Sequence, residues 1–149
     1  MAACGPNGPT GGSVLAHWLV KSDPETYGLA DLERDRKTRW DGVANAVAVR
    51  HIRAIRKGDD VFVYHSGADK AIVGVARAMT DGRDEPKNAK LAVFDLQFVR
   101  RLAFPVPLAA IKADAHFAGF DLVRLPRLSV LPVPAPLWQR LLAMAGEKA

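Results

Sequence analysis

The sequence predicts an α+β protein, in which a small β-barrel of five or six short strands is decorated by helices. Runs of hydrophobic alternation with a period of two residues are separated by turn signals and by shorter helical patterns. The chain has no internal repeat. Its 149 residues, 49% hydrophobic and 25% charged, match the length and composition of one globular domain with a core. This pattern favours a single barrel with inserted helices over two smaller domains.

We expect a flexible leader over residues 1–15 and a single domain over residues 16–147. The leader is rich in glycine and proline and has no continuous apolar run, so we expect neither a membrane span nor a signal peptide there. Its Cys4 is the only cysteine of the chain and cannot form an internal disulfide. A reducing, intracellular setting is therefore the expectation.

The first part of the domain is expected to hold one strand and two helices. The apolar run at residues 15–20 predicts a buried strand that ends at a Ser-Asp-Pro stop signal. Residues 29–33 predict a short helix after a glycine. A second helix is predicted over residues 45–56, because Asn45 can cap its first turn.

The period then changes to two residues, which predicts a hairpin and a long strand. Residues 61–64 and 71–78 are the expected hairpin strands, joined by a turn at residues 66–69. Residues 81–90 are polar and predict a loop. Residues 91–102 alternate and predict a long strand with one apolar face.

The last third of the chain mixes short elements. A short helix is predicted over residues 108–113, after a Pro-Val-Pro segment. An extended stretch is predicted through residues 122–124 and 128–130. The terminal helix is expected to begin at Pro136 and to end at Gly146, since proline suits the first helical turn and glycine suits the end.

Positive charge is concentrated in one segment. Between Arg34 and Lys57 there are eight basic and two acidic residues, a net charge of +6, whereas the whole chain carries +5. On a helical wheel, Arg50, Arg53 and Lys57 lie on one side, opposite the apolar face of the predicted helix. Such a cationic face is typical of polyanion binding, although a solvated basic helix without a partner fits the charge equally well.

The three tryptophans have different expected roles. Trp138 lies among leucines at helical spacing, which indicates a core position. Trp18 belongs to the first strand, where a core position and a pocket wall fit equally well. Trp40 lies between a basic run and the expected tight turn at Asp41-Gly42. An exposed aromatic side chain among cations is suited to stacking on nucleic-acid bases, and we favour that role over plain packing.

The sequence contains no enzyme signature. Tyr64, His65 and Ser66 end a strand at the mouth of a hairpin, where barrels often place ligands. His65 fits a core histidine, a hydrogen-bond donor or a base, and Ser66 lacks the nucleophile-elbow pattern. The four histidines are scattered, no metal-ligand spacing emerges, and there is no glycine-rich phosphate loop. We therefore expect no metal and no cofactor.

Four strings in register resemble one family, the EVE domains. Trp18–Pro24 resembles the opening W-x-x-K-S-(E/D)-P, and Trp40–Asn45 resembles the motif W-D-G-V-x-N. Phe62–Ser66 with Ile72–Gly74 resembles the hairpin F-Y-H-S followed by I-V-G. Leu122–Pro132 is similar to the C-terminal signature of the family. Each string is weak alone, but together they cover nearly the whole expected domain.

The resemblance implies a PUA-like β-barrel, related to YTH domains, whose pocket receives a modified nucleobase that has flipped out of nucleic acid. We expect Trp18, Trp40 and Tyr64 to wall a slot for one heterocycle. The pocket residues that the resemblance implies, carried over position by position, are Trp18, Lys21, Ser22, Trp40, Asp41, Val43, Asn45, Tyr64, His65, Ser66, Arg127, Leu128 and Ser129. The cations expected to contact flanking phosphates are Arg39, Arg50, Arg53 and Lys57.

This chain departs from the family at a few polar positions. Family members often have Arg where this chain has Ala44, and Tyr-Gln where it has Ala46-Val47. They often have Gln where it has Leu125 and Leu131. Reading the edge of a base needs donors and acceptors at fixed places, so these changes bear on which base is preferred.

We therefore predict a non-enzymatic reader that binds nucleic acid, with DNA carrying a modified base favoured over RNA. We expect no membrane partner, a monomer, and a cytoplasmic location, associated with the nucleoid if the protein is bacterial. One alternative is an enzyme that acts on a modified nucleobase or nucleoside through Lys21, His65 or Asp41, since the related ASCH group includes hydrolases. Another is an adaptor that binds RNA or docks an acidic protein through its basic face.

Overall fold

A computed structural model describes residues 16–41, 43 and 45–147. The leader expected over residues 1–15 and Gly42 of the expected turn lie outside these described residues. The strands are β1 (His17–Ser22), β2 (Lys37–Trp40), β3 (Asp60–His65), β4 (Ala71–Ala78), β5 (Arg83–Glu85), β6 (Asn88–Pro107) and β7 (Val130–Pro132). The helices are α1 (Pro24–Tyr27), α2 (Leu29–Asp35), α3 (Ala46–Ala54), α4 (Leu108–Ala113), the 3-10 helix η1 (Ala115–Phe117), α5 (Asp121–Arg124) and α6 (Ala135–Met144).

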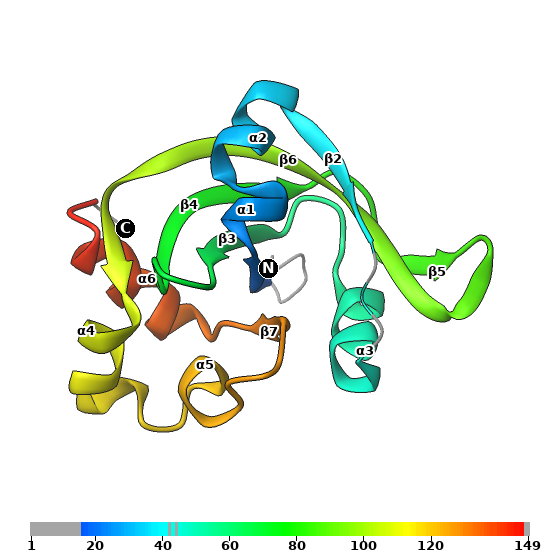
Figure 1. Ribbon diagram of the computed structural model, residues 1–149. Coiled ribbons are helices and arrows are strands. Elements are labelled where there is room, and N and C mark those ends of the chain that lie inside the picture. Colours follow the sequence, from blue (N-terminus) through cyan, green and yellow to red (C-terminus); the bar gives the residue numbers. More distant parts are fainter. Residues whose placement is uncertain (1–15, 42, 44, 148–149) are drawn as a thin grey trace, which may run out of the picture.

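The strands form one curled sheet, a half-barrel, in the order β2-β6-β4-β3-β1-β7 (Figure 1). Strands β1 and β3 are parallel, and the other neighbours are antiparallel. The short strand β5 pairs only with β6, as an extra hairpin beyond the main order. The predicted α+β class is therefore confirmed, but the described part of the chain contains seven strands instead of five or six.

One hydrophobic cluster joins buried side chains of the strands and of the helices. Leu19, Phe62 and Phe94, from three different strands, are fully buried. The ring of Trp138 on α6 stacks on Phe62 at a centroid distance of 3.8 Å, so its predicted core position is confirmed. Among the described residues, no helix is long and apolar enough to cross a membrane.

Helix α2 lies directly on the sheet because strand β4 has a glycine at the contact. A Cβ atom at Gly74 would lie 2.7 Å from the methyl groups of Leu29 and 3.1 Å from the Arg100 carbonyl oxygen, so the Leu29 side chain would have to move. This close approach places α1 and α2 above the centre of the sheet, beside β2 (Figure 1). The candidate site lies between α1 and β2, so its position depends on how α1 and α2 pack on the sheet.

Several elements form where the sequence predicts them. Helix α3 begins directly after Asn45, whose side-chain oxygen accepts hydrogen bonds from the N–H groups of Val47 and Ala48 at 3.0 and 3.1 Å. The hairpin of β3 and β4 and the helices α2, α4 and α6 also agree with the predictions. Strand β6 is longer than expected, because it continues to Pro107 and pairs with β2, β4 and β5.

Two strands, β5 and β2, lie where the sequence predicted no strand. The polar loop expected at residues 81–90 is instead a hairpin of β5 and the start of β6. Strand β2 lies in the basic run, where pairing with β6 sets Arg39 opposite Asp95 and Trp40 opposite Phe94. Cross-strand pairs of this kind stabilise β2, which at four residues is too short to show a clear pattern in its sequence.

The predicted stop after the first strand begins a helix. The Asp23 carboxylate accepts a hydrogen bond from the Glu25 N–H at 2.9 Å, and Pro24 occupies the first helical turn of α1. The extended stretch expected at residues 122–124 is instead the helix α5, in which Asp121 of the first turn pairs with Arg124 at 2.9 Å and adds a small stabilisation. Of the second extended stretch, only Val130 belongs to a strand, β7.

Candidate nucleic-acid interface

A cavity of about 500 Å³ opens where the end of β1, helix α1 and the end of β2 meet. This volume lies within the range of pockets that bind small organic groups. Its lining residues are Lys21, Ser22, Asp23, Thr26, Tyr27, Thr38, Arg39, Trp40, Asp41, Val43 and Ser129. We call it the aromatic cavity, because the rings of Tyr27 and Trp40 line it.

Trp40 ends β2 and is partly buried against the core. Its backbone pairs with Phe94 on β6, so the indole is carried by a strand of the sheet and not by a free loop. The sequence analysis favoured base stacking over plain packing for this side chain. In the structure, the ring both packs against the core and lines the aromatic cavity.

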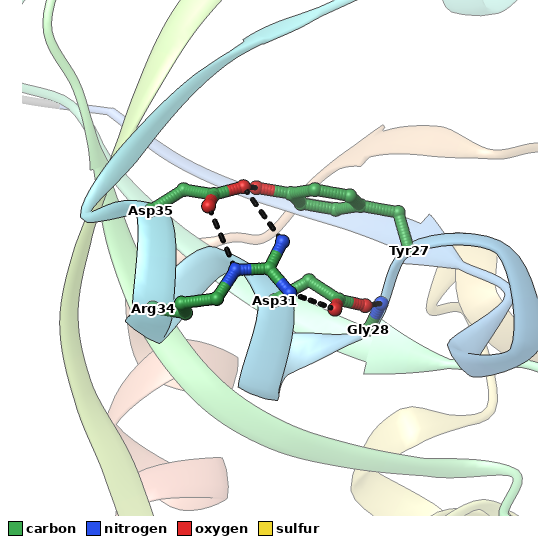
Figure 2. Close-up of polar contacts among 5 residues, drawn as sticks. All are labelled: Tyr27, Gly28, Asp31, Arg34 and Asp35. Atoms are coloured by element: carbon green, nitrogen blue, oxygen red, sulfur yellow. Dashed lines mark hydrogen bonds and ion pairs between the residues drawn. The ribbon is translucent and has the colours of Figure 1, made fainter.

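Tyr27 is the second aromatic residue of the cavity, and polar contacts with α2 fix its orientation (Figure 2). Its hydroxyl donates to the Asp35 carboxylate at 2.8 Å. Arg34 donates to both oxygens of Asp35, at 2.9 and 3.2 Å, and to Asp31 at 3.2 Å. Asp31 in turn accepts from the Gly28 N–H at 2.8 Å, which closes the network at the start of α2.

This network also affects the ionisation of Tyr27. Burial, and then the hydrogen bond to Asp35, raise the pKa of the Tyr27 hydroxyl above its usual value. The phenol therefore stays protonated and continues to donate at neutral pH. The sequence analysis missed Tyr27, because a four-residue helix such as α1 is too short to show a periodic signal.

Lys21 and Ser22 bring polar groups from the end of β1 to the cavity. The Lys21 ammonium donates to the Pro126 carbonyl at 2.7 Å and lies 5.7 Å from the centroid of the Tyr64 ring. Burial lowers the pKa of this lysine. Ser22 is buried, and its hydroxyl donates to the carbonyl of Tyr27, which ties α1 to β1.

Trp18 lies outside the aromatic cavity, which corrects the expected slot. Its side chain is only 6% exposed, and its indole N–H donates to Asp59 at 2.9 Å. Four residues separate Trp18 from Ser22 along β1, about 13 Å in an extended strand. The indole is therefore a core group at the opposite end of the strand from the cavity.

Tyr64, His65 and Ser66 support the cavity from outside its lining. Tyr64 is 4% exposed and lies next to Lys21. The Nε2 atom of His65 accepts from the Leu29 N–H at 2.9 Å, and its Nδ1 atom lies 3.1 Å from the Asp69 carboxylate. An accepting Nε2 requires the proton on Nδ1, so both nitrogens of this ring are engaged. The backbone N–H of Ser66 donates to the Ser22 carbonyl, which joins the two strand ends.

Asn45, Arg127 and Leu128 line a separate hollow of about 330 Å³ beside the start of α3. The side-chain oxygen of Asn45 is engaged in capping this helix. The hollow also contains Val47 and Leu125, two of the positions where the chain departs from the family. The other departures are Ala46, which is exposed on α3, Leu131, which is fully buried in β7, and Ala44, which is outside the described residues.

The four cations expected to contact phosphate have different surroundings. Arg39 lines the aromatic cavity, and Arg50 is exposed on α3. The guanidinium of Arg53 is engaged by the β5–β6 hairpin, since it donates to Asp84 at 2.9 Å and to the Ala89 carbonyl at 2.6 Å. Lys57 lies in the turn after α3. Sequence reasoning missed the engagement of Arg53 because it predicted a loop where this hairpin lies.

Comparisons with known proteins agree on one family. The profile of the EVE domain matches residues 16–144. Human thymocyte nuclear protein 1 is 30% identical over 157 residues, which cover 81% of this chain and 70% of that protein. An NMR structure of a protein from Rhodopseudomonas palustris has a TM-score of 0.84 at 36% identity, and covers 89% of this chain and 94% of its own.

A second solved structure contains nucleic acid. The human THYN1 protein in complex with 5-methylcytosine-containing DNA has a TM-score of 0.80 to this chain at 26% identity. The match covers 90% of this chain and 99% of that one.

Proposed function

The chain belongs to the EVE domain family, and we propose that it binds nucleic acid and holds one modified nucleobase in the aromatic cavity. The observation that carries this proposal is the cavity itself, because it combines two aromatic rings, Trp40 and Tyr27, with polar groups and an adjacent basic strand. The complex of the human THYN1 protein with methylated DNA supports DNA as the partner and 5-methylcytosine as the first base to test.

Stacking on the aromatic rings would supply affinity. Every nucleobase has a π-face, and stacking on an aromatic side chain is worth about 1–3 kcal/mol per base. The backbone pairing of β2 holds Trp40, and the hydrogen bond to Asp35 orients Tyr27. Rings that are already oriented lose little side-chain entropy on binding, which favours affinity.

Polar groups around the cavity would read the edge of the base. Lys21, Thr26, Thr38 and Ser129 offer donors, and the Asp41 carboxylate offers an acceptor for an exocyclic amino group. Val43 gives the lining an apolar side chain, which can contact the methyl group of a modified base. A base inside a duplex would have to flip out of the stack to reach these groups.

We propose a reader and not an enzyme. The ring nitrogens of His65 are both engaged in hydrogen bonds on α2 and the hairpin turn, away from the aromatic cavity. The Lys21 ammonium donates to a backbone carbonyl. These engagements favour binding and orientation over proton transfer.

The test is the affinity of Trp40→Ala for an oligonucleotide that carries a single 5-methylcytosine, measured by fluorescence anisotropy beside the unmodified sequence. The loss of stacking should weaken binding by about 1–3 kcal/mol, or roughly 5- to 150-fold. Phe104→Ala is the matched control, since Phe104 is an aromatic residue that is 64% exposed on β6 and does not line the aromatic cavity. An unchanged affinity in folded Trp40→Ala would remove the indole from the site.

A further inference from the structure

A second hollow, of about 300 Å³, adjoins the aromatic cavity along β2. Its lining residues are Lys37, Thr38, Arg39, Met79, Thr80 and Asp95. Thr38 and Arg39 line both spaces, so the two hollows adjoin along β2. We call this second space the strand-edge hollow, because β2 is an edge strand in the order of the sheet.

The strand-edge hollow has more positive than negative charge. Lys37 and Arg39 line it, and Arg83 on β5 reaches it by donating to Thr80 at 2.9 Å and to Asp95 at 3.3 Å. Asp95 is the one carboxylate among the lining residues. The Nε atom of Arg39 lies 4.0 Å from Asp95, which is beyond hydrogen-bond distance. The two side chains therefore form a long ion pair without a hydrogen bond, which leaves the N–H groups of Arg39 able to donate to a phosphate.

The geometry of β2 connects these cations with the stacking residue. Lys37 and Trp40 are three residues apart on one strand, about 10 Å along its length. In contrast, Arg53 on α3 already donates to Asp84 and to a backbone carbonyl. A phosphate at Arg53 would have to compete with these contacts. At the strand-edge hollow, three cations, Lys37, Arg39 and Arg83, surround the one carboxylate of Asp95.

We propose that the strand-edge hollow binds a backbone phosphate of the strand whose base occupies the aromatic cavity. The nucleic acid then leaves the cavity along β2 and not along α3. Lys37 and Arg39 contact the phosphate, and Arg83 adds positive charge from the side of β5. This inference rests on the proposed function and adds to it the direction of the bound strand.

The experiment measures the salt dependence of binding for Lys37→Gln and Arg83→Gln. The probe is the same oligonucleotide with a single 5-methylcytosine, titrated over a series of NaCl concentrations. Each phosphate contact contributes about 0.7–0.9 to the slope of log K against log salt, so Lys37→Gln should reduce the slope by about that amount. The preference for the modified base should stay unchanged, because the aromatic cavity is intact.

Two further variants complete the design. Arg100→Gln removes one positive charge from β6 that Glu147 holds at 2.7 Å and that lines neither hollow, and it should leave the slope unchanged. Arg50→Gln tests the route along α3. A slope that falls in Arg50→Gln and not in Lys37→Gln would overturn the proposed route.

The two proposals can fail separately. If the wild-type protein binds the modified and unmodified oligonucleotides equally, the proposed function fails, and the slopes still decide where the phosphates lie. If the modified base is preferred but Lys37→Gln and Arg83→Gln both keep the wild-type slope, the strand-edge hollow is not a phosphate site. Circular dichroism of each variant confirms that it is folded before these comparisons are made.

Discussion

Replacing Asp59 by alanine should destabilise the domain strongly, because one buried carboxylate joins three segments of the chain. Asp59 is 2% exposed. Its Oδ1 atom accepts from the Ala16 N–H at 3.1 Å, and its Oδ2 atom accepts from the Trp18 indole and the Arg56 N–H, both at 2.9 Å. It therefore connects the start of β1 and the end of α3 to the start of β3.

The magnitude follows from the donors that the substitution leaves unpaired. A buried donor without a partner costs about 1–3 kcal/mol, and neighbouring contributions are not additive. We therefore expect Asp59→Ala to lower the free energy of unfolding by about 3–5 kcal/mol, a large part of the roughly 5–15 kcal/mol typical of a domain. Asp59→Asn keeps the shape and one acceptor, so its loss should be smaller.

Urea denaturation followed by tryptophan fluorescence measures these changes. Asp60→Ala is the matched control, because this neighbouring carboxylate makes a partly exposed ion pair with Arg77 at 3.2 Å, worth about 0–1 kcal/mol. If Asp59→Ala lost no more stability than Asp60→Ala, the structural role of Asp59 would be refuted. Folded Asp59→Asn should also keep its affinity for nucleic acid, since Trp18 is a core group outside the aromatic cavity.

Three more substitutions test other features. Tyr27→Ala should weaken binding of the modified base by about 1–3 kcal/mol, and Tyr27→Phe by less because the ring remains; equal losses would mean that the hydroxyl and not the ring matters. The hydrogen bond from Arg140, and then those from the N–H and the ring of His116, lower the pKa of Asp114 from 3.8 to about 2. The stabilisation that the Asp114 carboxylate gives to the folded state is therefore complete above pH 3.8, the pKa in the unfolded chain, and is lost as the pH falls through about 2. NMR titration should show that Arg140→Gln raises this pKa, and an unchanged value would show that Arg140 is not its cause. A Cβ atom at Gly82 would lie 1.6 Å from the Ile52 carbonyl oxygen, so Gly82→Ala should cost about 3 kcal/mol or more in thermal unfolding, and a small loss would show that α3 moves freely.

Local sequence signals predicted the parts of the fold that depend on local chemistry. The cap at Asn45, the turn between β3 and β4 and the alternation in β6 act over a few residues, and each was found where expected. Strand β2 could not be predicted in this way. Its four residues alternate between exposed and half-buried positions, and its stability comes from pairing with β6, more than fifty residues later in the chain.

The same distinction applies to the candidate site. Family motifs indicated Lys21, Trp40 and Ser129, and the structure places all three around one cavity although they are far apart in the sequence. They did not indicate Tyr27, because its position depends on a short helix and a contact with α2. Trp18 was assigned to the pocket because it belongs to the same motif as Lys21, but in an extended strand a short sequence separation is a long distance.

The position of β1 has a consequence for synthesis. This first strand lies between β3 and β7, and the Lys21 N–H donates to the Ser129 carbonyl at 2.9 Å. Lys21 and Ser129 both line the aromatic cavity, so its wall is completed only when the last quarter of the domain has left the ribosome and reached the first strand. A nascent chain that ends before residue 129 therefore has no complete binding cavity, and it cannot capture a base there.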